Sequence, residues 1–196
     1  MTKGRLGILI AACVLLGIVL TLGLRSLTSG GAAVPTAANR TLGSAASPAA
    51  TRSTLGLPDH DRTPGAINPA ATQDNLASTV CKSGWAKSVR PPAAYTSALK
   101  IVQILEYGYA DRNPSHYQED HLVPLELGGA PRDKRNLWPE PNTVTMADGT
   151  TIGSKEKDDL EDALHAQVCA GTLLLADAQL GIARDWVAEW EAAGRP

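Results

Sequence analysis

YQEDHLVPLELGGAPRDKRNLWPE, residues 117–140, is the stretch of this chain that decides its fold. Within it, His121 to Leu125 suits a short strand that enters a turn at Gly128-Gly129, so the stretch predicts a β-hairpin. Pro139 and Pro141 are expected to stop any regular element that follows. The rest of the folded part should pack around this hairpin.

Helical spacing flanks the hairpin on both sides. The segment 95–106 places apolar residues on one face, either Leu99, Val102 and Leu105 or Ile101 and Leu105. Ser154 is a plausible N-cap for a helix to Cys169, and 176–190 is a last amphipathic helix. The predicted fold class is α+β, a small hairpin and helix motif packed among helices.

The N-terminus is expected to enter a membrane. Residues 6–24 are nineteen apolar, Gly and Thr residues after Lys3 and Arg5, about the length that crosses a bilayer as a helix. The basic residues place the N-terminus in the cytoplasm, so the sequence predicts a single-pass anchor in 1–25 and an extracytoplasmic remainder. A cleaved signal peptide is the alternative, and it would make the protein secreted.

Composition divides the remainder in two. Residues 26–64 are rich in Ala, Ser, Thr, Gly and Pro and predict a disordered linker, which includes the Asp59-His60-Asp61 triplet. The folded domain is expected at 65–196, where all four Trp and all four Tyr lie. Cys81 and Cys169, on the oxidising side of the membrane, predict a disulfide within it.

The charge of the domain argues against tight non-specific binding to nucleic acid. From Asn68 onward there are twelve Lys and Arg against eighteen Asp and Glu, a net charge of −6. Two basic runs still allow local binding of a nucleic-acid substrate, although each could equally be a solvated surface. They are Arg132, Lys134 and Arg135 beside the hairpin, and Lys82, Lys87 and Arg90 before it.

Asp120 and His121 carry the candidate chemistry. A neutral imidazole can take a proton from water, and a neighbouring carboxylate can bind Mg²⁺ through oxygen. On a strand the two side chains point to opposite faces, so they share one site only if the strand bends or bulges there.

This segment resembles the HNH (His-Me finger, ββα-metal) nucleases, in particular their secreted actinobacterial type. The resemblance lies in Asp120-His121, Pro124-Leu125, Gly128-Gly129 and Asn136, and extends through 63–70, 80–92 and 157–171. It implies a ββα-metal finger in which Asp120 binds the metal, His121 is the general base, and Asn136 fixes the loop that aims the histidine. The implied cofactor is a divalent ion, Mg²⁺ or Mn²⁺, with Zn²⁺ as an alternative.

The sequence departs from the family pattern at the ligand that closes the metal site. Asn142 and Asp158 are the candidates, although a carboxylate at a helix N-terminus is also explained by the helix dipole. His165 is expected to serve in packing and His116 to be a loop residue without a role.

Two hypotheses follow. The first is a metal-dependent endonuclease that hydrolyses phosphodiester bonds of DNA or RNA, tethered outside the cytoplasm. The second is a non-catalytic, envelope-anchored binding or scaffold domain with a degenerate finger, which the acidic domain and the missing ligand favour.

Overall fold

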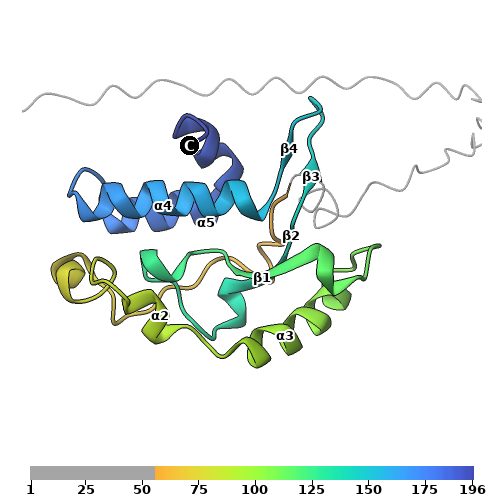
Figure 1. The fold of residues 1–196 in the computed structure, drawn as a ribbon, viewed down its shortest axis with the longest axis horizontal. Coiled ribbons are helices and arrows are strands. Elements are labelled where there is room, and N and C mark those ends of the chain that lie inside the picture. The colour runs from red at the N-terminus through yellow and green to blue at the C-terminus, as the bar shows by residue number, and fades with distance from the viewer. Residues whose placement is uncertain (1–55) are drawn as a thin grey trace, which may run out of the picture. The chain divides into compact units, whose positions relative to one another are not determined.

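A computed structural model describes residues 56–196, which form helices and two small antiparallel sheets (Figure 1). The α+β class predicted from the sequence is confirmed. The short 3₁₀ helices are η1 (Gln73–Ser78), η2 (Pro114–His116), η3 (Leu125–Leu127) and η4 (Lys134–Asn136). The other elements are α2 (Trp85–Val89), α3 (Ala93–Glu106), β1 (Tyr117–His121), β2 (Leu137–Pro141), β3 (Val144–Thr145), β4 (Thr151–Ile152), α4 (Ser154–Cys169) and α5 (Leu175–Ala192).

The β1–β2 hairpin lies between two helical layers. The helices α4 and α5 run side by side on one side of it, and α3 packs on the other (Figure 1). The main core fills the space beneath α4 and α5, with Leu122, Trp138, Leu160, Ile182 and Trp186 each 2% exposed or less. The helices α4 and α5 therefore each turn an apolar face to this core.

The strands differ from the prediction in position. The first strand ends at His121, where the predicted one begins, and Leu125–Leu127 is the 3₁₀ turn η3. Pro139 and Pro141, expected to stop regular structure, lie inside β2, where Pro139 pairs with Glu119. A two-stranded sheet has two open edges, so a proline can face an edge at which no N–H is required.

The helix α3 turns a different face to the core from the one predicted. Leu99, Gln103 and Ile104 are its buried residues, whereas Val102 and Leu105 are about half exposed, at 46% and 53%. The amide of Gln103 explains the difference, because its Nε2 donates to the Leu137 carbonyl at 2.9 Å. A polar residue with a backbone partner thus occupies the face that hydrophobic spacing assigns to apolar residues.

Two features near the C-terminus have local causes. The segment before α4 contains the β3–β4 hairpin, whose turn includes Asp148-Gly149. The helix α5 is interrupted at Asp185, with φ −165° and ψ 89°. The Asp185 carboxylate accepts a hydrogen bond from the Ala188 N–H at 3.0 Å, so it caps the second half of the helix.

The folded part begins earlier than the predicted boundary at residue 65. Leu57 is 4% exposed, Thr63 is fully buried, and Trp186 donates to the Gly56 carbonyl at 2.8 Å. Asp59 organises a turn between them by accepting from the Asp61 N–H and pairing with Arg62. Residues 56–64 are therefore part of the domain, not of a linker.

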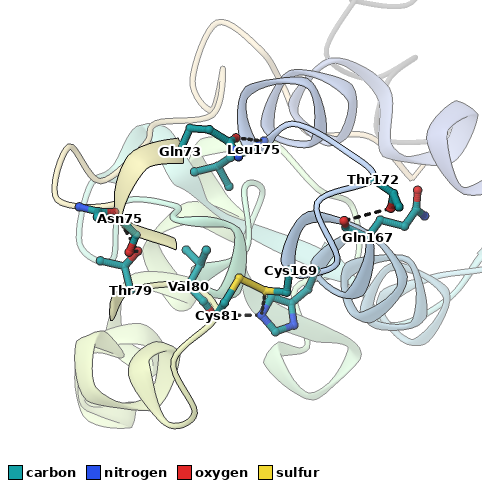
Figure 2. The surroundings of a disulfide bond; sticks show 10 residues. Gln73, Asn75, Thr79, Val80, Cys81, Gln167, Cys169, Thr172 and Leu175 are labelled. Carbon is teal, nitrogen blue, oxygen red and sulfur yellow. Dashed lines mark hydrogen bonds between the residues drawn. A yellow bond between two sulfur atoms is a disulfide. The ribbon is translucent and has the colours of Figure 1, made fainter. Parts of the chain in front are cut away.

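A disulfide between Cys81 and Cys169 closes the domain across a separation of 88 residues (Figure 2). It joins the end of α4 to the segment that follows η1, and it is the pair predicted from the sequence. Within residues 56–196 no helix has both the length and the apolar character needed to span a bilayer. The predicted anchor at 1–25 and most of the linker at 26–64 lie outside the described residues.

Candidate active site

His121 is the last residue of β1 and is held in one orientation by the backbone. Its ring is buried, with 4% of the residue exposed, and Nε2 lies 3.0 Å from the Pro131 carbonyl. A carbonyl only accepts, so Nε2 carries the hydrogen and the neutral ring keeps its lone pair on Nδ1. Burial lowers the pKa of His121, against the opposing effects of the Pro131 carbonyl and Asp120. The imidazole is therefore neutral at neutral pH, with Nδ1 as the basic nitrogen.

Asn136 holds the loop that supplies this carbonyl. It is fully buried at the end of η4, and its Oδ1 accepts from the Val123 N–H at 2.9 Å. Its Nδ2 donates to the carbonyls of Val123 at 2.9 Å and Ala130 at 3.2 Å. Because Ala130 precedes Pro131, the amide fixes the segment whose carbonyl orients the histidine.

The two glycines of the loop are needed for different reasons. Gly128 has φ 78°, a left-handed conformation that other residues rarely adopt. Gly129 has no room for a side chain, since an added Cβ would lie 1.8 Å from the Val123 carbonyl oxygen. The Gly-Gly pair therefore lets the loop approach Val123 closely enough for Asn136 to bridge the two strands.

Asp120 lies on the opposite side of the hairpin, against α4, where it belongs to a buried charged cluster. Lys157 of α4 is fully buried, and its Nζ lies 2.6 Å from Asp120 Oδ2 and 3.1 Å from the His121 carbonyl oxygen. The same ammonium pairs with Glu161, one turn further along α4. Lys157 thus ties α4 to the end of β1.

The cluster contains a third carboxyl group, that of Glu140 on β2, which is 1% exposed. Burial, followed by the charge of Asp120, raises the pKa of Glu140 well above its usual range, so this group carries a proton. Burial alone would lower the pKa of Lys157, but the surrounding carboxylates raise it above its ordinary value. The ammonium therefore stays charged and offsets the charge of Asp120, whereas burial raises the pKa of Glu161 to about 8.

Asp120 and His121 leave β1 toward different sides. The ladder runs without interruption from Tyr117 opposite Pro141 to His121 opposite Leu137, so the bulge that would bring the two side chains together is absent from it. Alternation along the strand then directs Asp120 to α4 and the His121 ring to the loop at Pro131. The two groups are electrostatic neighbours, because the Asp120 charge raises the pKa of His121, but they contact different elements.

The charges of Asp120, at the end of β1, and Asp158, on α4, interact with each other. The hydrogen bond from Lys157 uses only Oδ2 of Asp120. Asp158 follows Lys157 on α4, and partial burial raises its pKa, with the negative charge of Asp120 as the next cause. Two carboxylates that repel each other in this way would be stabilised by a bound cation.

Asn142, the other predicted ligand, lies away from this site. It follows Pro141, which pairs with Tyr117 at the far end of the hairpin from His121, about 13 Å along the strand at 3.3 Å per residue. Its side chain donates to the Ser115 carbonyl at 2.8 Å. Asn142 serves as a link between β2 and η2, so its assignment as a metal ligand is wrong.

The predicted basic residues lie on the loop that orients His121. Arg132, Lys134 and Arg135 are all exposed. Arg132 stacks over the Tyr95 ring at 5.3 Å, whereas Arg135 is paired with Asp133. The charge of Arg90, from the second basic run, is one of the causes that lower the pKa of His121. Of the predicted basic residues, Arg90 is thus the one whose charge acts on the imidazole.

The remaining histidines lie elsewhere. His116 is exposed and pairs with Asp111 at 2.5 Å. His165 is partly buried and lies 2.9 Å from the Val80 carbonyl oxygen. Among residues 56–196, the group of three His, Cys, Asp or Glu residues whose ligand atoms lie close enough for a metal is Cys81, His165 and Cys169, in which the two sulfurs form the disulfide.

Comparison with protein-family models, with curated proteins and with solved structures finds no match to this chain.

Sequence reasoning missed Lys157, Glu140 and Glu161. Lys157 shares the helical face of Leu160, Leu164 and Val168, all buried. A lysine within a predicted apolar face is the signal that could have identified it, since such a residue needs an acidic partner. The buried glutamate between Pro139 and Pro141 gives no comparable periodic signal.

Proposed function

We propose that this domain is a metal-dependent phosphodiesterase of the HNH type that cleaves nucleic acid, with His121 as its general base. The observation that carries the proposal is the hydrogen bond from His121 Nε2 to the Pro131 carbonyl, which leaves Nδ1 free of its proton. A ββα-metal finger composed of β1, β2 and α4 is the corresponding finer description of the fold.

The proposed reaction begins with a water molecule beside His121 Nδ1. The imidazole removes a proton as the water oxygen attacks phosphorus, and the bond to the leaving oxygen breaks. A divalent cation would stabilise charge on the phosphate and the leaving oxygen. Asp120 and Asp158 would hold it beside His121 only if the end of β1 bends and Lys157 releases Asp120 Oδ2. Asn136 and Pro131 act by orientation, because they fix which imidazole nitrogen faces the water.

The substrate would be bound by the basic loop. Arg132 and Lys134 are exposed beside Pro131, and Arg90 lies near the ring from another segment. Because the domain is acidic, these few cationic side chains provide local contacts to phosphate but no strong attraction between the whole domain and nucleic acid. We therefore propose short contacts to the nucleic-acid backbone and cleavage that weakens as salt rises.

The decisive experiment is plasmid nicking by the purified protein with Mg²⁺ or Mn²⁺. His121→Ala is expected to lower the rate at least about 100-fold, the usual contribution of a positioned general base. His116→Ala is the matched control, since His116 is exposed and bound to Asp111 at the other end of β1, and it should cut as the unchanged protein does. Equal cutting by both variants would contradict the proposal.

A second candidate function is a non-catalytic binding domain anchored in the cell envelope. Two observations favour it: Lys157 already provides a cation at Asp120, and Asp120 and His121 contact different elements of the fold. Calorimetric titration with Mn²⁺ separates the candidates. The nuclease should bind the ion in a way that Asp120→Asn weakens, whereas a scaffold should show no binding that depends on Asp120.

A further inference from the structure

The cluster formed by Cys81, His165 and Cys169 lies outside the proposed active site. His165 and Cys169 are one turn apart on α4, so they share a face of the helix. His165 Nε2 lies 3.4 Å from Cys169 Sγ, and the potential ligand atoms of all three residues are within 4.8 Å of one another. Figure 2 shows the disulfide at this end of α4.

These positions correspond to a tetrahedral zinc site once the sulfur–sulfur bond is broken. Zinc binds thiolate sulfur at about 2.3 Å and imidazole nitrogen at about 2.0 Å, so two such ligands in a tetrahedron lie about 3.5 Å apart. The observed separation of Nε2 and Sγ, 3.4 Å, already matches that edge. We propose that reduction of the Cys81–Cys169 disulfide converts this cluster into a zinc site with Cys81, His165 and Cys169 as protein ligands.

Glu126 is the residue that would complete the coordination. It lines, with Cys81 and His165, a pocket of about 360 Å³. Its Oε1 is buried without a hydrogen-bond partner among residues 56–196. Its carboxylate is not among the ligand atoms that lie within 4.8 Å of one another, so Glu126 would become the fourth zinc ligand only after its side chain turns toward the cluster.

The cluster is reachable from solvent. Cys169 is exposed at the end of α4, and the pocket opens beside Cys81 and His165. A small dithiol can therefore attack the disulfide, and the ion can enter by the pocket. The site would be closed to metal in the oxidised protein because both sulfurs are bonded to each other.

The conversion balances in two steps. A dithiol reductant transfers two electrons and two protons to the disulfide, giving two cysteine thiols and the oxidised, cyclic form of the reductant. Binding of Zn²⁺ then releases both thiol protons to solvent. The His165 hydrogen must also move from Nε2, where it now bonds the Val80 carbonyl, to Nδ1, because Nε2 needs its lone pair for the metal.

The test is zinc binding by the full chain before and after reduction with a dithiol that is removed under anaerobic conditions. The oxidised protein should bind no Zn²⁺ at this site, and the reduced protein should bind one ion per chain. With Co²⁺ as a spectroscopic probe, the reduced protein should give the sulfur-to-metal charge-transfer and tetrahedral visible bands of a thiolate site.

Variants identify the ligands. His165→Ala should weaken zinc binding by the reduced protein at least about 100-fold, more than the loss typical of an outer-shell residue. His116→Ala should bind as the unchanged protein does. The proposal is overturned if the reduced protein binds no zinc, or if His165→Ala binds as tightly as His116→Ala. If reduction unfolds the protein, circular dichroism measures whether Zn²⁺ restores the fold. Refolding on addition of Zn²⁺ supports the site, and failure to refold contradicts it.

Discussion

Asn136 acts as a structural hub, because one buried amide connects segments that share no regular ladder. Its oxygen accepts from the Val123 N–H and, at 3.4 Å, from the Ala66 N–H, while its nitrogen serves two carbonyls. Each of these backbone groups would otherwise be buried without a partner, which costs about 1–3 kcal/mol apiece. The loop that orients His121 is thus fixed by a single side chain.

Asn136→Ala should lower the free energy of unfolding by about 3–5 kcal/mol, because it leaves several buried backbone groups unsatisfied. Asn142→Ala is a matched control, since Asn142 is exposed and makes one side-chain hydrogen bond, to Ser115. We expect the control to lose less than about 1 kcal/mol. Urea unfolding of both variants measures the difference, and losses of equal size would contradict the hub.

Glu119 predicts a pH dependence of stability. Both of its carboxyl oxygens are buried without a hydrogen-bond partner in the described part of the chain, and burial raises its pKa to about 8, with Asp120 as the next cause. A folded-state pKa above the unfolded value of about 4.5 means that the folded state binds the proton more tightly. The contribution to stability is complete below pH 4.5 and is lost as pH rises through 8.

Glu119→Gln should therefore be more stable than the unchanged protein at pH 9, by a few kcal/mol, and similar to it at pH 4. Thermal and urea unfolding across this range measure the two curves. The control is Glu106→Gln, a change at an exposed carboxylate of α3, whose curve should run parallel to that of the unchanged protein. Parallel curves for Glu119→Gln as well would show that Glu119 is not the responsible group.

At the scale of elements, α4 is attached to the hairpin by charge as well as by apolar packing. Lys157 bonds both the Asp120 carboxylate and the His121 carbonyl at the end of β1. An ammonium without exposure is tolerated only with such partners, and its removal leaves the carboxylates without a counter-ion. The position of α4 relative to His121 therefore depends on one lysine.

Lys157→Met keeps most of the side-chain volume and removes the charge. We expect a loss of about 3–5 kcal/mol in the free energy of unfolding at pH 7, and a smaller loss at pH 5, where the carboxyl groups protonate more readily. Lys155→Met is the control, because Lys155 is exposed and pairs only with Asp159 on the same helix. We expect no measurable change in the free energy of unfolding of the control. If Lys157→Met also shows no change, the charged cluster contributes no net stability.

Elements that depend on apolar spacing were predicted correctly, whereas features that depend on a partner elsewhere in the fold were not. The helices 154–169 and 176–190 follow from apolar spacing, and the structure has α4 at Ser154–Cys169 and α5 at Leu175–Ala192. The buried face of α3 was mispredicted because Gln103 gains a backbone partner on β2, which periodicity cannot show. The strand β2 was missed because proline is excluded only where its N–H is needed, and that depends on which strand edges are open.

The candidate site shows the same division. The resemblance to HNH nucleases implied that Asn136 fixes the loop at His121, and the cysteine count predicted the pairing of Cys81 with Cys169. Glu140 could not be predicted, because the charged groups around it, Asp120 and Lys157, lie 17 or more residues away along the chain and its own charge argues for exposure. Asn142 was misassigned because the sequence does not show that β2 carries it to the far end of the hairpin.

At the scale of the whole molecule, residues 56–64 close the core from outside the predicted domain. Their composition resembles that of a linker, yet Leu57 packs in the main core and Thr63 donates to the Leu137 carbonyl at 3.2 Å. The segment is held because its few large or polar side chains each meet a partner from the distant C-terminal half. The average composition of a segment does not reveal such individual contacts, so the domain boundary predicted from composition lies about nine residues too late.

A protein that begins at Gly65 should therefore be less stable than one that begins at Leu55, by about 3–5 kcal/mol. The shorter form exposes the apolar surface under Leu57, worth about 1.5–3 kcal/mol, and leaves Trp186 without the Gly56 carbonyl. In the longer form, Leu57→Ala should lose about 2–4 kcal/mol, whereas Asp61→Ala, at an exposed position of the same segment, should lose little. Guanidinium unfolding of the four proteins tests this order. Equal stability of the two lengths would mean that residues 56–64 are bound too weakly to belong to the folded unit, and the domain would then begin where the sequence predicts.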